Sequence, residues 1–315
     1  MSETVKHDLV IVGGGPAGLS AALYATRYGL DAITLEMASY GGQITTTPDL
    51  DNYPGLPSVG GAELGELMRS HAESLGASFI SDEALSISQV DGQFLTHCYG
   101  ADYLSHALIY AAGAQPRLAG FEGEEGFRGR GVSYCATCDG MFYRNKDVFV
   151  VGGGNTACDE ALFLSGLAAS VTMLVRKDVT RADEALLRQV TSTENIKVRY
   201  LTKIDSVKGE SLIEEMVLSN TSTGERETLK FAPGSTGVFV AVGQTPNVAL
   251  VDDYVDVAPD GSIRTDGTMA TKTPGLFVAG DARSKPLRQV ITAASDGAVA
   301  AHTAAEFLRT VSCSL

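Results

Sequence analysis

The sequence predicts an α/β protein with two Rossmann-like units, one of them inserted into the other. A glycine-rich turn at residues 13–18 follows a short apolar run, and the same pattern recurs at residues 152–157. A helical pattern and a second apolar run follow each turn, which is the order that a dinucleotide fold requires. A third feature, the pair Cys135 and Cys138, stands just ahead of the second turn.

The first unit is predicted to begin with a buried strand at residues 8–12, followed by a turn, a helix at 19–28 and a strand at 31–35. The turn consists of Gly13, Gly14, Gly15, Pro16, Ala17 and Gly18. Gly13 permits the tight turn, Gly15 lets the backbone approach a pyrophosphate, and Gly18 lets the helix pack closely on the strand. Glu36, after the second strand, can accept hydrogen bonds from a ribose.

The second unit repeats this order, with strands at 147–151 and 170–174 and a helix at 159–165. Its turn consists of Gly152, Gly153, Gly154, Asn155, Thr156 and Ala157, with Ala157 in the third glycine's place. The repeat is an internal duplication of a nucleotide-binding unit and not a short-period solenoid.

The second unit has no acid at the ribose position. Val175, Arg176 and Lys177 stand there, and Arg181 follows. Basic side chains at this point suit a 2′-phosphate, and hence NADPH over NADH. The alternative is an ordinary solvated basic turn.

Two similar strands mark the edges of the insertion. Residues 107–113 end at Gly113, and residues 238–243 end at Gly243. We therefore expect one domain of residues 1–115 and 245–315, and an inserted domain of residues 116–244. Asp281, after a strand at 276–279, could hold the ribityl or phosphate part of a flavin nucleotide.

Composition limits the partners and the compartment. A chain of 315 residues with 44% hydrophobic and 20% charged residues can form two packed domains. The net charge of −14 argues against binding nucleic acid or an anionic membrane surface. No apolar run approaches the ~18 residues of a membrane span, and the N-terminus lacks signal-peptide features. We expect a cytoplasmic protein.

The cysteines point to redox chemistry. With five cysteines and one close pair, a disulfide framework is not expected, so Cys135 and Cys138 indicate a redox or metal site. Zinc needs about four ligands, and no second pair has metal spacing, so no metal is predicted. Asp139 could donate the proton that thiol chemistry needs, or could simply cap a helix. Cys98, Cys158 and Cys313 are interpreted as non-catalytic, as is His302.

The whole chain resembles the low-molecular-weight bacterial thioredoxin reductases, a class of pyridine nucleotide-disulfide oxidoreductases. Beside the two turns and the segment 135–139, the resemblance rests on residues 41–43 and 45–47, on Gly280 and Asp281, and on residues 288–292. It implies a homodimer that passes electrons from NADPH through FAD and the Cys135–Cys138 disulfide to thioredoxin.

The resemblance also implies residue roles. Cys138 would face the flavin, Cys135 would attack the disulfide of thioredoxin, and Asp139 would exchange the proton. FAD would bind in the outer domain and NADPH in the inserted one. The residues expected at FAD, beyond the first turn and Glu36, are Gly41, Gly42, Gln43, Asn52, Gly113, Gly280, Asp281, Arg288, Gln289 and Val290.

One departure leaves alternatives open. The family usually has His-Arg-Arg where this chain has Val175, Arg176 and Lys177. A ferredoxin-dependent thioredoxin reductase or a flavin dithiol oxidase of the same fold are therefore alternatives. Because the nicotinamide and Cys138 must each meet the flavin, we expect the inserted domain to swivel on hinges near residues 113–117 and 243–247.

Overall fold

The computed structural model describes residues 4–47 and 49–312. The chain divides into two compact units. The outer unit consists of Met1–Gln115 and Thr245–Leu315, and the inserted unit is Pro116–Gln244. Within the described residues, no helix is both long and apolar enough to cross a membrane.

The outer unit contains a seven-stranded sheet with the order β3-β2-β1-β6-β5-β4, in which β17 also pairs with β6. β4 and β5 are antiparallel additions to an otherwise parallel sheet. The strands are β1 (Thr4–Val12), β2 (Ala32–Leu35), β3 (Ser78–Ile80), β4 (Ala84–Val90), β5 (Gln93–Cys98), β6 (Asp102–Tyr110) and β17 (Leu276–Val278). The first glycine turn follows β1, where β2 and β6 lie on opposite sides. Open α/β sheets bind ligands at such a point.

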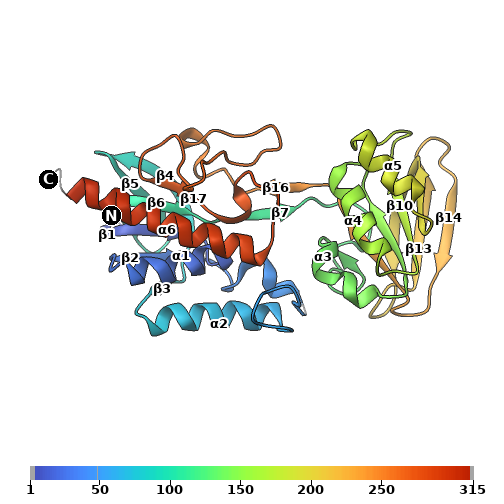
Figure 1. The fold of residues 1–315 in the computed structure, drawn as a ribbon, viewed down its shortest axis with the longest axis horizontal. Helices are drawn as coiled ribbons and strands as arrows, with labels where there is room; N and C mark the ends of the chain where they lie inside the picture. Colours follow the sequence, from blue (N-terminus) through green and yellow to red (C-terminus); the bar gives the residue numbers. More distant parts are fainter. Residues whose placement is uncertain (1–3, 48, 313–315) are drawn as a thin grey trace. The chain divides into compact units, whose positions relative to one another are not determined.

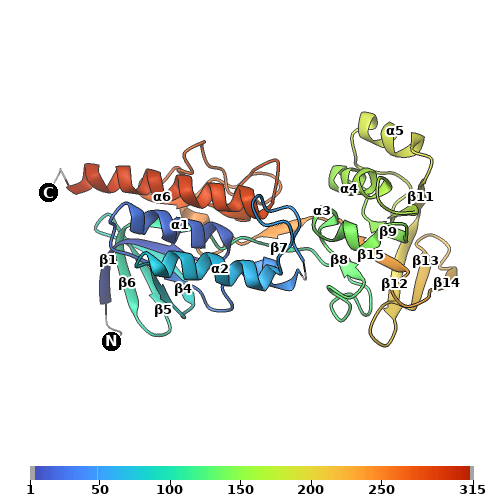
Figure 2. The same ribbon diagram turned by 60° about the horizontal axis from the view of Figure 1, so that its bottom comes forward.

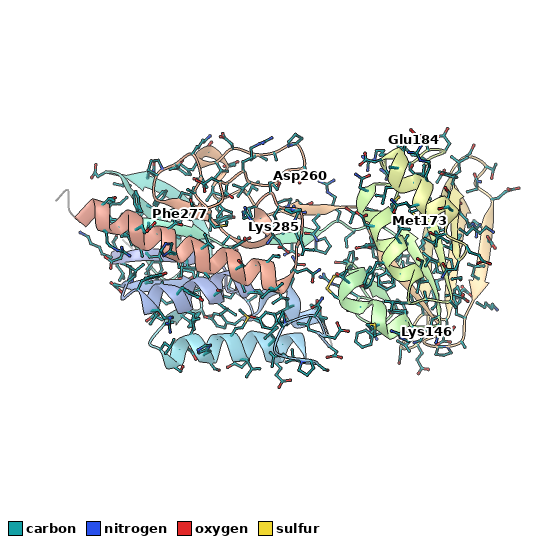
Figure 3. The ribbon with its side chains drawn as sticks, in the orientation of Figure 1. Lys146, Met173, Glu184, Asp260, Phe277 and Lys285 are labelled. Atoms are coloured by element: carbon teal, nitrogen blue, oxygen red, sulfur yellow. A yellow bond between two sulfur atoms is a disulfide. The ribbon has the colours of Figure 1, made fainter. Side chains whose placement is uncertain are left out.

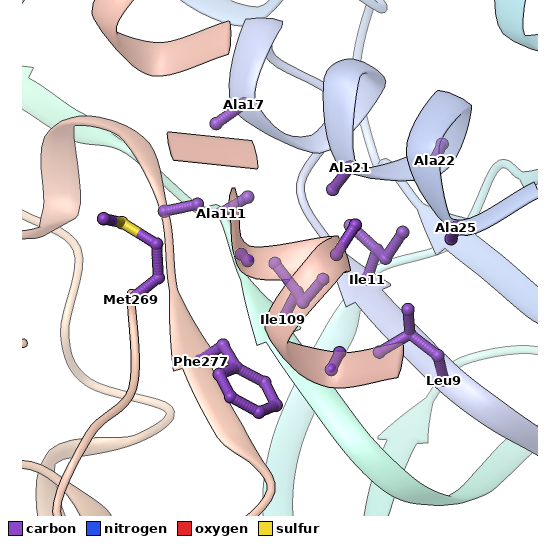
Figure 4. Packing of buried hydrophobic residues seen from close by; sticks show 14 of the residues in the cluster. Leu9, Ile11, Ala17, Ala21, Ala22, Ala25, Ile109, Ala111, Met269 and Phe277 are labelled. Atoms are coloured by element: carbon purple, nitrogen blue, oxygen red, sulfur yellow. The ribbon is translucent and has the colours of Figure 1, made fainter. Parts of the chain in front are cut away.

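The helices of the outer unit pack closely because their contact residues are small. α1 (Pro16–Arg27) and α6 (Val290–Ser312) lie side by side (Figures 1 and 2). Ala21 and Ala25 of α1 face the apolar side chains of β1 (Figure 4). The remaining helical elements are α2 (Gly61–Ser74) and the 3-10 turns η1 (Gly42–Thr46), η3 (Asp252–Tyr254) and η4 (Gly280–Ala282).

The inserted unit repeats the parallel arrangement with the strand order β11-β10-β9-β15-β8 and adds an antiparallel sheet, β12-β13-β14. The strands are β8 (Val132–Ser133), β9 (Asp147–Val151), β10 (Ser170–Val175), β11 (Ile196–Tyr200), β12 (Thr202–Lys208), β13 (Glu215–Asn220), β14 (Arg226–Lys230) and β15 (Thr236–Val240). The second glycine turn again follows the strand, here β9, at which the order changes direction.

Four helical elements complete the inserted unit. They are α3 (Ala136–Asp139), the 3-10 turn η2 (Gly140–Tyr143), α4 (Asn155–Ser165) and α5 (Glu184–Ser192). Met173 of β10, labelled in Figure 3, belongs to the same buried cluster as Ala157 and Ala161 of α4. α4 therefore lies against the parallel sheet, with its N-terminus at the glycine turn.

Two short strands, β7 (Ala114–Pro116) and β16 (Gln244–Pro246), form the segments that lead into and out of the inserted unit, and they pair with each other. At one end of the pair, Asn247 N donates to Gly113 O over 3.0 Å. At the other, Arg117 N donates to Gly243 O over 3.0 Å. Backbone hydrogen bonds therefore tie together the two segments that the sequence predicts as hinges.

Several predicted element boundaries were wrong by a few residues. α1 begins at Pro16, because proline fits the first helical position, where its missing N–H would be unpaired in any case. α4 begins at Asn155, directly after Gly154, which serves as its N-cap. β1 begins at Thr4, since its polar first residues alternate between partly buried and exposed positions beside β6.

Candidate functional site

The first glycine turn is held so tightly that side chains are excluded from it. Gly13 has a φ of +108°, and a Cβ there would lie 2.5 Å from Ala111 O. A Cβ on Gly18 would lie 1.8 Å from Gly13 O, so the helix touches the turn backbone. Gly15 is different, because the nearest atom to its Cβ position, Gly41 O, is 4.0 Å away. Protein atoms therefore fill the space beside Gly13, whereas the space beside Gly15 is open.

The N-terminus of α1 offers free amides at this opening. Gly15 is the N-cap and makes no side-chain cap hydrogen bond, and the first turn of α1 contains no acidic residue. Pro16 and Ala17 begin the helix. Unpaired N–H groups and the helix dipole favour an anion at such a position.

Glu36 closes the turn from the side of β2. Its Oε2 accepts a hydrogen bond from Gly14 N over 2.6 Å, and its Oε1 accepts one from Ala38 N over 2.8 Å. Gly14 O in turn accepts from Gly41 N over 2.8 Å, and Gly42 follows against Gly15. The structure thus brings Glu36, Gly41 and Gly42, three of the residues expected at FAD, to the turn. It also gives Glu36 a backbone-holding role that the sequence did not indicate.

The segment after β17 reaches the same turn. A Cβ on Gly280 would lie 3.0 Å from the Cβ of Ala17. Asp281 follows, and its Oδ1 is shielded from solvent and lacks a hydrogen-bond partner among the described residues. Lys285 Nζ lies 3.2 Å from this oxygen, but the pair does not have hydrogen-bond geometry. Asp281 Oδ1 therefore remains available to a hydroxyl donor.

A buried ion network supports this segment. Lys285 Nζ lies 3.0 Å from Asp296 Oδ2, and the two side chains are only 4% and 9% exposed. Asp296 also binds Arg283 over 3.1 Å and accepts a hydrogen bond from Gly280 N. Lys285 is labelled in Figure 3, near the start of α6. This network was not predicted from the sequence, although an acid in an alanine-rich helix was a usable signal.

The other residues expected at the flavin are placed unevenly. Asn52 Nδ2 donates to Gln289 Oε1 over 3.2 Å, so these two lie together. Val290 is buried at the start of α6, and Arg288 Nε is shielded without a hydrogen-bond partner among the described residues. Gln43 is exposed on η1. Gly113 directly precedes β7, and its carbonyl accepts a hydrogen bond from Asn247 N over 3.0 Å.

The second glycine turn has the same closed and open ends as the first. A Cβ on Gly152 would lie 2.4 Å from Ala241 O. Gly154, the N-cap of α4, has no atom within 4 Å of its Cβ position, makes no side-chain cap hydrogen bond and is followed by no acid in the first turn. Thr156 is exposed there, and Ala157 is buried in the core.

Backbone and amide contacts, and not an acid, close this second turn. Arg181 N donates to Gly153 O over 2.6 Å. Asn155 exchanges two hydrogen bonds with Asp183, each 2.8 Å long. Asn155 therefore anchors the loop that carries Arg181, which is a structural role that the sequence analysis did not predict.

Three cations stand free beside this turn. Arg176, Lys177 and Arg181 are all exposed. Within residues 4–47 and 49–312, none of them forms an ion pair. The backbone holds them in place: Thr221 Oγ1 donates to Arg176 O over 2.8 Å, and Leu201 N donates to Lys177 O over 3.0 Å. Exposed, unpaired cations beside an open anion site can bind an additional phosphate.

Cys135 and Cys138 form a disulfide in the inserted unit, with their Cα atoms 5.3 Å apart. Cys135 ends the segment after β8, and Cys138 lies on α3. Both residues are partly exposed. Cys98 and Cys158 are buried free cysteines, and burial raises the pKa of both thiols, as expected for non-catalytic residues. Cys313 lies outside the described residues.

Asp139 is tied to the disulfide loop through Ser133. Ser133 Oγ accepts from Cys135 N over 3.1 Å, and the same hydroxyl hydrogen-bonds to Asp139. Burial raises the pKa of Asp139, and the Ser133 bond opposes that shift. Asp139 makes no cap hydrogen bond, and its Oδ1 is buried without a partner among the described residues. This carboxyl can therefore hold a proton next to Cys138.

A second carboxyl near the disulfide was also missed from the sequence. Burial raises the pKa of Glu160, on α4, to about 8, and the nearby backbone of Ala136, which stands between the two cysteines, opposes that shift. Glu160 and Ala136 are 24 positions apart in the sequence. Among the described residues, no three His, Cys, Asp or Glu side chains lie close enough together to bind a metal.

Two open dinucleotide turns and a Cys-x-x-Cys disulfide define a nucleotide-dependent disulfide oxidoreductase. Residues 7–297 match the family model of the pyridine nucleotide-disulphide oxidoreductases. The chain belongs to this family.

Several relatives are named thioredoxin reductases. A thioredoxin reductase from Treponema pallidum (strain Nichols) is 43% identical, over 97% of this chain and 98% of its own. A thioredoxin reductase from Peptoclostridium litorale is 40% identical, over 96% and 97%. The crystal structure of a thioredoxin reductase from Streptococcus pyogenes MGAS5005 is 35% identical, with a TM-score of 0.89 over 97% of this chain and 99% of that one. The predicted resemblance and fold class are confirmed.

Proposed function

We propose that this protein is an NADPH-dependent, FAD-containing reductase of thioredoxin. The observation that carries the proposal is the Cys135–Cys138 disulfide, with the buried acid Asp139 beside it, in a unit that has its own open nucleotide turn. This enzyme class agrees with the names of two relatives, both called thioredoxin reductase, which the chain matches over nearly their full length.

The outer unit fits FAD. The open space at Gly15 and the uncapped start of α1 suit its pyrophosphate. Asp281 Oδ1, which accepts no hydrogen bond from the described residues, suits a hydroxyl donor such as the ribityl chain. Glu36 keeps lone pairs for a ribose after binding its two backbone amides. The residues proposed around them are those expected from the sequence, with Asn52 and Gln289 acting as a pair.

The inserted unit fits NADPH. Gly154 and the first turn of α4 suit the pyrophosphate, and Arg176, Lys177 and Arg181 suit the 2′-phosphate. The two bound cofactors together supply a two-electron path from NADPH to the disulfide. A ferredoxin-dependent reductase or a dithiol oxidase has less support, because neither needs this second turn or its free cations.

The two cysteines are proposed to have different roles. Cys135 attacks the disulfide of thioredoxin, and Cys138 then displaces thioredoxin by re-forming the bond with Cys135. Asp139 holds the proton that the departing thiolate takes up, since its raised pKa favours the protonated form. A homodimer and a cytoplasmic location are parts of the same proposal.

Trapping of a mixed disulfide tests these roles. We expect the Cys138→Ser variant to accumulate a covalent complex with thioredoxin, because Cys135 can attack but nothing resolves the product. The Cys135→Ser variant should form none, while its flavin still accepts electrons from NADPH. Non-reducing gels and mass spectrometry measure the complex, and a complex with Cys135→Ser alone would reverse the assignment. Light scattering of the intact protein tests the dimer.

A further inference from the structure

A buried carboxylate, Glu124, connects the redox segment to the chain that leaves β7. Glu124 is only 3% exposed. Its Oε1 accepts hydrogen bonds from Ala119 N over 2.8 Å and from the Tyr134 hydroxyl over 2.9 Å, and its Oε2 accepts one from Gly120 N over 2.6 Å. Tyr134 directly precedes Cys135 in the sequence. One side chain therefore joins two segments that are separate in the sequence.

The backbone around Glu124 is itself anchored within the inserted unit. Glu122 N donates to Asp205 O over 3.0 Å, and Glu122 O accepts a hydrogen bond from Val207 N over 2.9 Å. At the start of the segment that Glu124 holds, Arg117 N donates to Gly243 O over 3.0 Å. That segment is exposed to solvent and begins at the predicted hinge. Glu124 therefore links a fixed part of the unit to an exposed hinge segment.

Hydrogen bonds, and not an ion pair, stabilise the charge of Glu124. Among residues 4–47 and 49–312, no basic side chain forms an ion pair with it. Arg128 lies over the Tyr134 ring instead, with its guanidinium carbon 5.2 Å from the ring centroid. A buried carboxylate that loses one of three donors is left poorly solvated, so each of these hydrogen bonds is costly to break. The Tyr134 side chain is therefore held both at its hydroxyl and at its ring.

We propose that Glu124 is a positioning residue of the redox pair, which couples the segment that leaves β7 to closure of the Cys135–Cys138 disulfide through the Tyr134 hydroxyl. This inference rests on the proposed redox role of the two cysteines. It deepens that role, because it lets a segment of the predicted hinge influence how readily the disulfide forms.

Disulfide closure is sensitive to the backbone that carries the cysteines. The two sulfurs meet only in a narrow range of geometries, which a loosened chain adopts less often. In equilibrium with dithiothreitol, the reagent loses two electrons and two protons as it closes its own disulfide ring, and Cys135 and Cys138 take them up as two thiols. Loss of the hydrogen bond between Tyr134 and Glu124 should free the chain ahead of Cys135 and shift this equilibrium towards the dithiol.

The disulfide equilibrium of the holoenzyme tests the proposal without NADPH or thioredoxin. The protein is equilibrated anaerobically with mixtures of reduced and oxidised dithiothreitol, and its thiols are trapped with iodoacetamide. Trypsin then releases residues 131–144, a peptide that contains both cysteines of the pair and no other. Wild-type protein is compared with Tyr134→Phe, which loses only the hydroxyl, with Glu124→Gln, and with the double variant. Glu125→Gln changes the exposed neighbouring acid and is the matched control.

We expect Tyr134→Phe to shift the equilibrium towards the dithiol by about three- to tenfold, which corresponds to a reduction potential higher by about 14–30 mV. The double variant should match Glu124→Gln within about twofold, because both substitutions break the same link. Glu125→Gln should follow wild type. A wild-type equilibrium in Tyr134→Phe, additive effects in the double variant or an equal shift in Glu125→Gln would overturn the proposal. If Glu124→Gln does not fold, the comparison of Tyr134→Phe with Glu125→Gln still decides.

The coupling also acts in the reverse direction, because linkage between two sites is reciprocal. Hydrogen exchange of residues 118–121 is compared in the oxidised and the dithiothreitol-reduced holoenzyme by mass spectrometry. We expect reduction to speed the exchange of the Ala119 and Gly120 amides by about three- to tenfold in wild type. In Tyr134→Phe, where Glu124 still accepts both amides, the change should stay under about twofold. Wild-type exchange that does not depend on the redox state would contradict the coupling. Failure of the mixed-disulfide trap, by contrast, would bear on the proposed function alone.

Discussion

The two glycine turns of this chain share a backbone but differ in what surrounds it. Each follows a strand at which the strand order of its sheet changes direction. Backbone atoms crowd the first glycine of each turn, Gly13 or Gly152, whereas the space at Gly15 or Gly154 is open. The outer turn is tied by the carboxylate of Glu36 to Gly14 N. The inserted turn is tied by Arg181 N to Gly153 O, and three cations stand exposed beside it.

This difference teaches how one fold is adapted to two nucleotides. The anion site at the helix N-terminus is a property of the backbone, so duplication preserves it. Selectivity lies at the end of the second strand, where an acid accepts hydrogen bonds from ribose hydroxyls and basic residues donate them to a phosphate. The inserted turn can leave its cations free because backbone and amide contacts do the holding that Glu36 does in the outer turn.

The largest expected effect comes from exchanging the residue types of Gly18 and Ala157, which occupy corresponding positions where α1 and α4 meet their turns. In Gly18→Ala, the new Cβ would lie 1.8 Å from a backbone oxygen, which no rotamer can relieve. We expect loss of bound FAD or of soluble protein. The reciprocal Ala157→Gly should cost about 1 kcal/mol and leave NADPH binding intact. Absorbance and melting of the two proteins measure this, and a Gly18→Ala variant with full FAD content would contradict it.

The buried ion network belongs to the outer unit alone and provides the next test. Lys285→Met leaves the buried Asp296 with one cation, Arg283, and the Gly280 amide, so we expect about 3 kcal/mol of lost stability and earlier FAD release on heating. The matched control is Lys272→Met, which removes an exposed pair with Asp256 and should cost under about 1 kcal/mol. The temperature at which flavin fluorescence appears reports both. Equal shifts would mean that the buried network does not support the flavin segment.

Carboxyls also distinguish the units, because Glu36 binds two amides, whereas Glu160 Oε2 is shielded from solvent without a hydrogen-bond partner among the described residues. The pKa of Glu160 is raised from 4.5 to about 8 in the folded protein. The stability that its proton provides is therefore complete below the unfolded value and is lost as the pH rises to the folded one, by about 1.4 kcal/mol per unit. Glu160→Gln should remove this loss, so its advantage in melting temperature over wild type should grow across that window. A constant difference would contradict the assignment.

The free cations are expected to give the smallest effect of the series. Losing one charge-assisted hydrogen bond of roughly 1.5–3 kcal/mol should raise the KM for NADPH about tenfold or more, with little change for NADH. Arg176→Ala should have a larger effect than Lys177→Ala, because a guanidinium can bind two phosphate oxygens. Steady-state kinetics of these variants and of Arg181→Ala provide the measurement. Equal losses with both nucleotides would assign these residues to the fold instead.

Local patterns in the sequence were enough for the repeated unit. The close backbone approaches at Gly13 and Gly18 and the open space at Gly15 follow from the absence of a side chain. Hydrophobic periodicity predicted the strands and helices around them. Helix starts were predicted late because Pro16 and Asn155 look like turn residues, although both fit a first helical turn.

The contacts that support the site could not be predicted in this way. Ser133 reaches Asp139 from β8, Glu160 of α4 lies near Ala136, and Lys285 reaches Asp296 across a helix start. Each depends on tertiary packing, which leaves no period or spacing in the sequence. Asn155 shows the same limit, since its partner Asp183 lies 28 residues away.

Anaerobic reduction of the bound flavin by NADPH and by NADH tests the central claim most directly. The claim is that the inserted turn and its cations bind NADPH, and that electrons from NADPH pass through FAD to the Cys135–Cys138 disulfide. We expect NADPH to bleach the flavin absorbance rapidly and to generate two thiols at Cys135 and Cys138, and NADH to do so at least about tenfold more slowly at equal concentration. A flavin that neither nucleotide reduces would contradict this account and move the protein to a ferredoxin-dependent reductase or a dithiol oxidase.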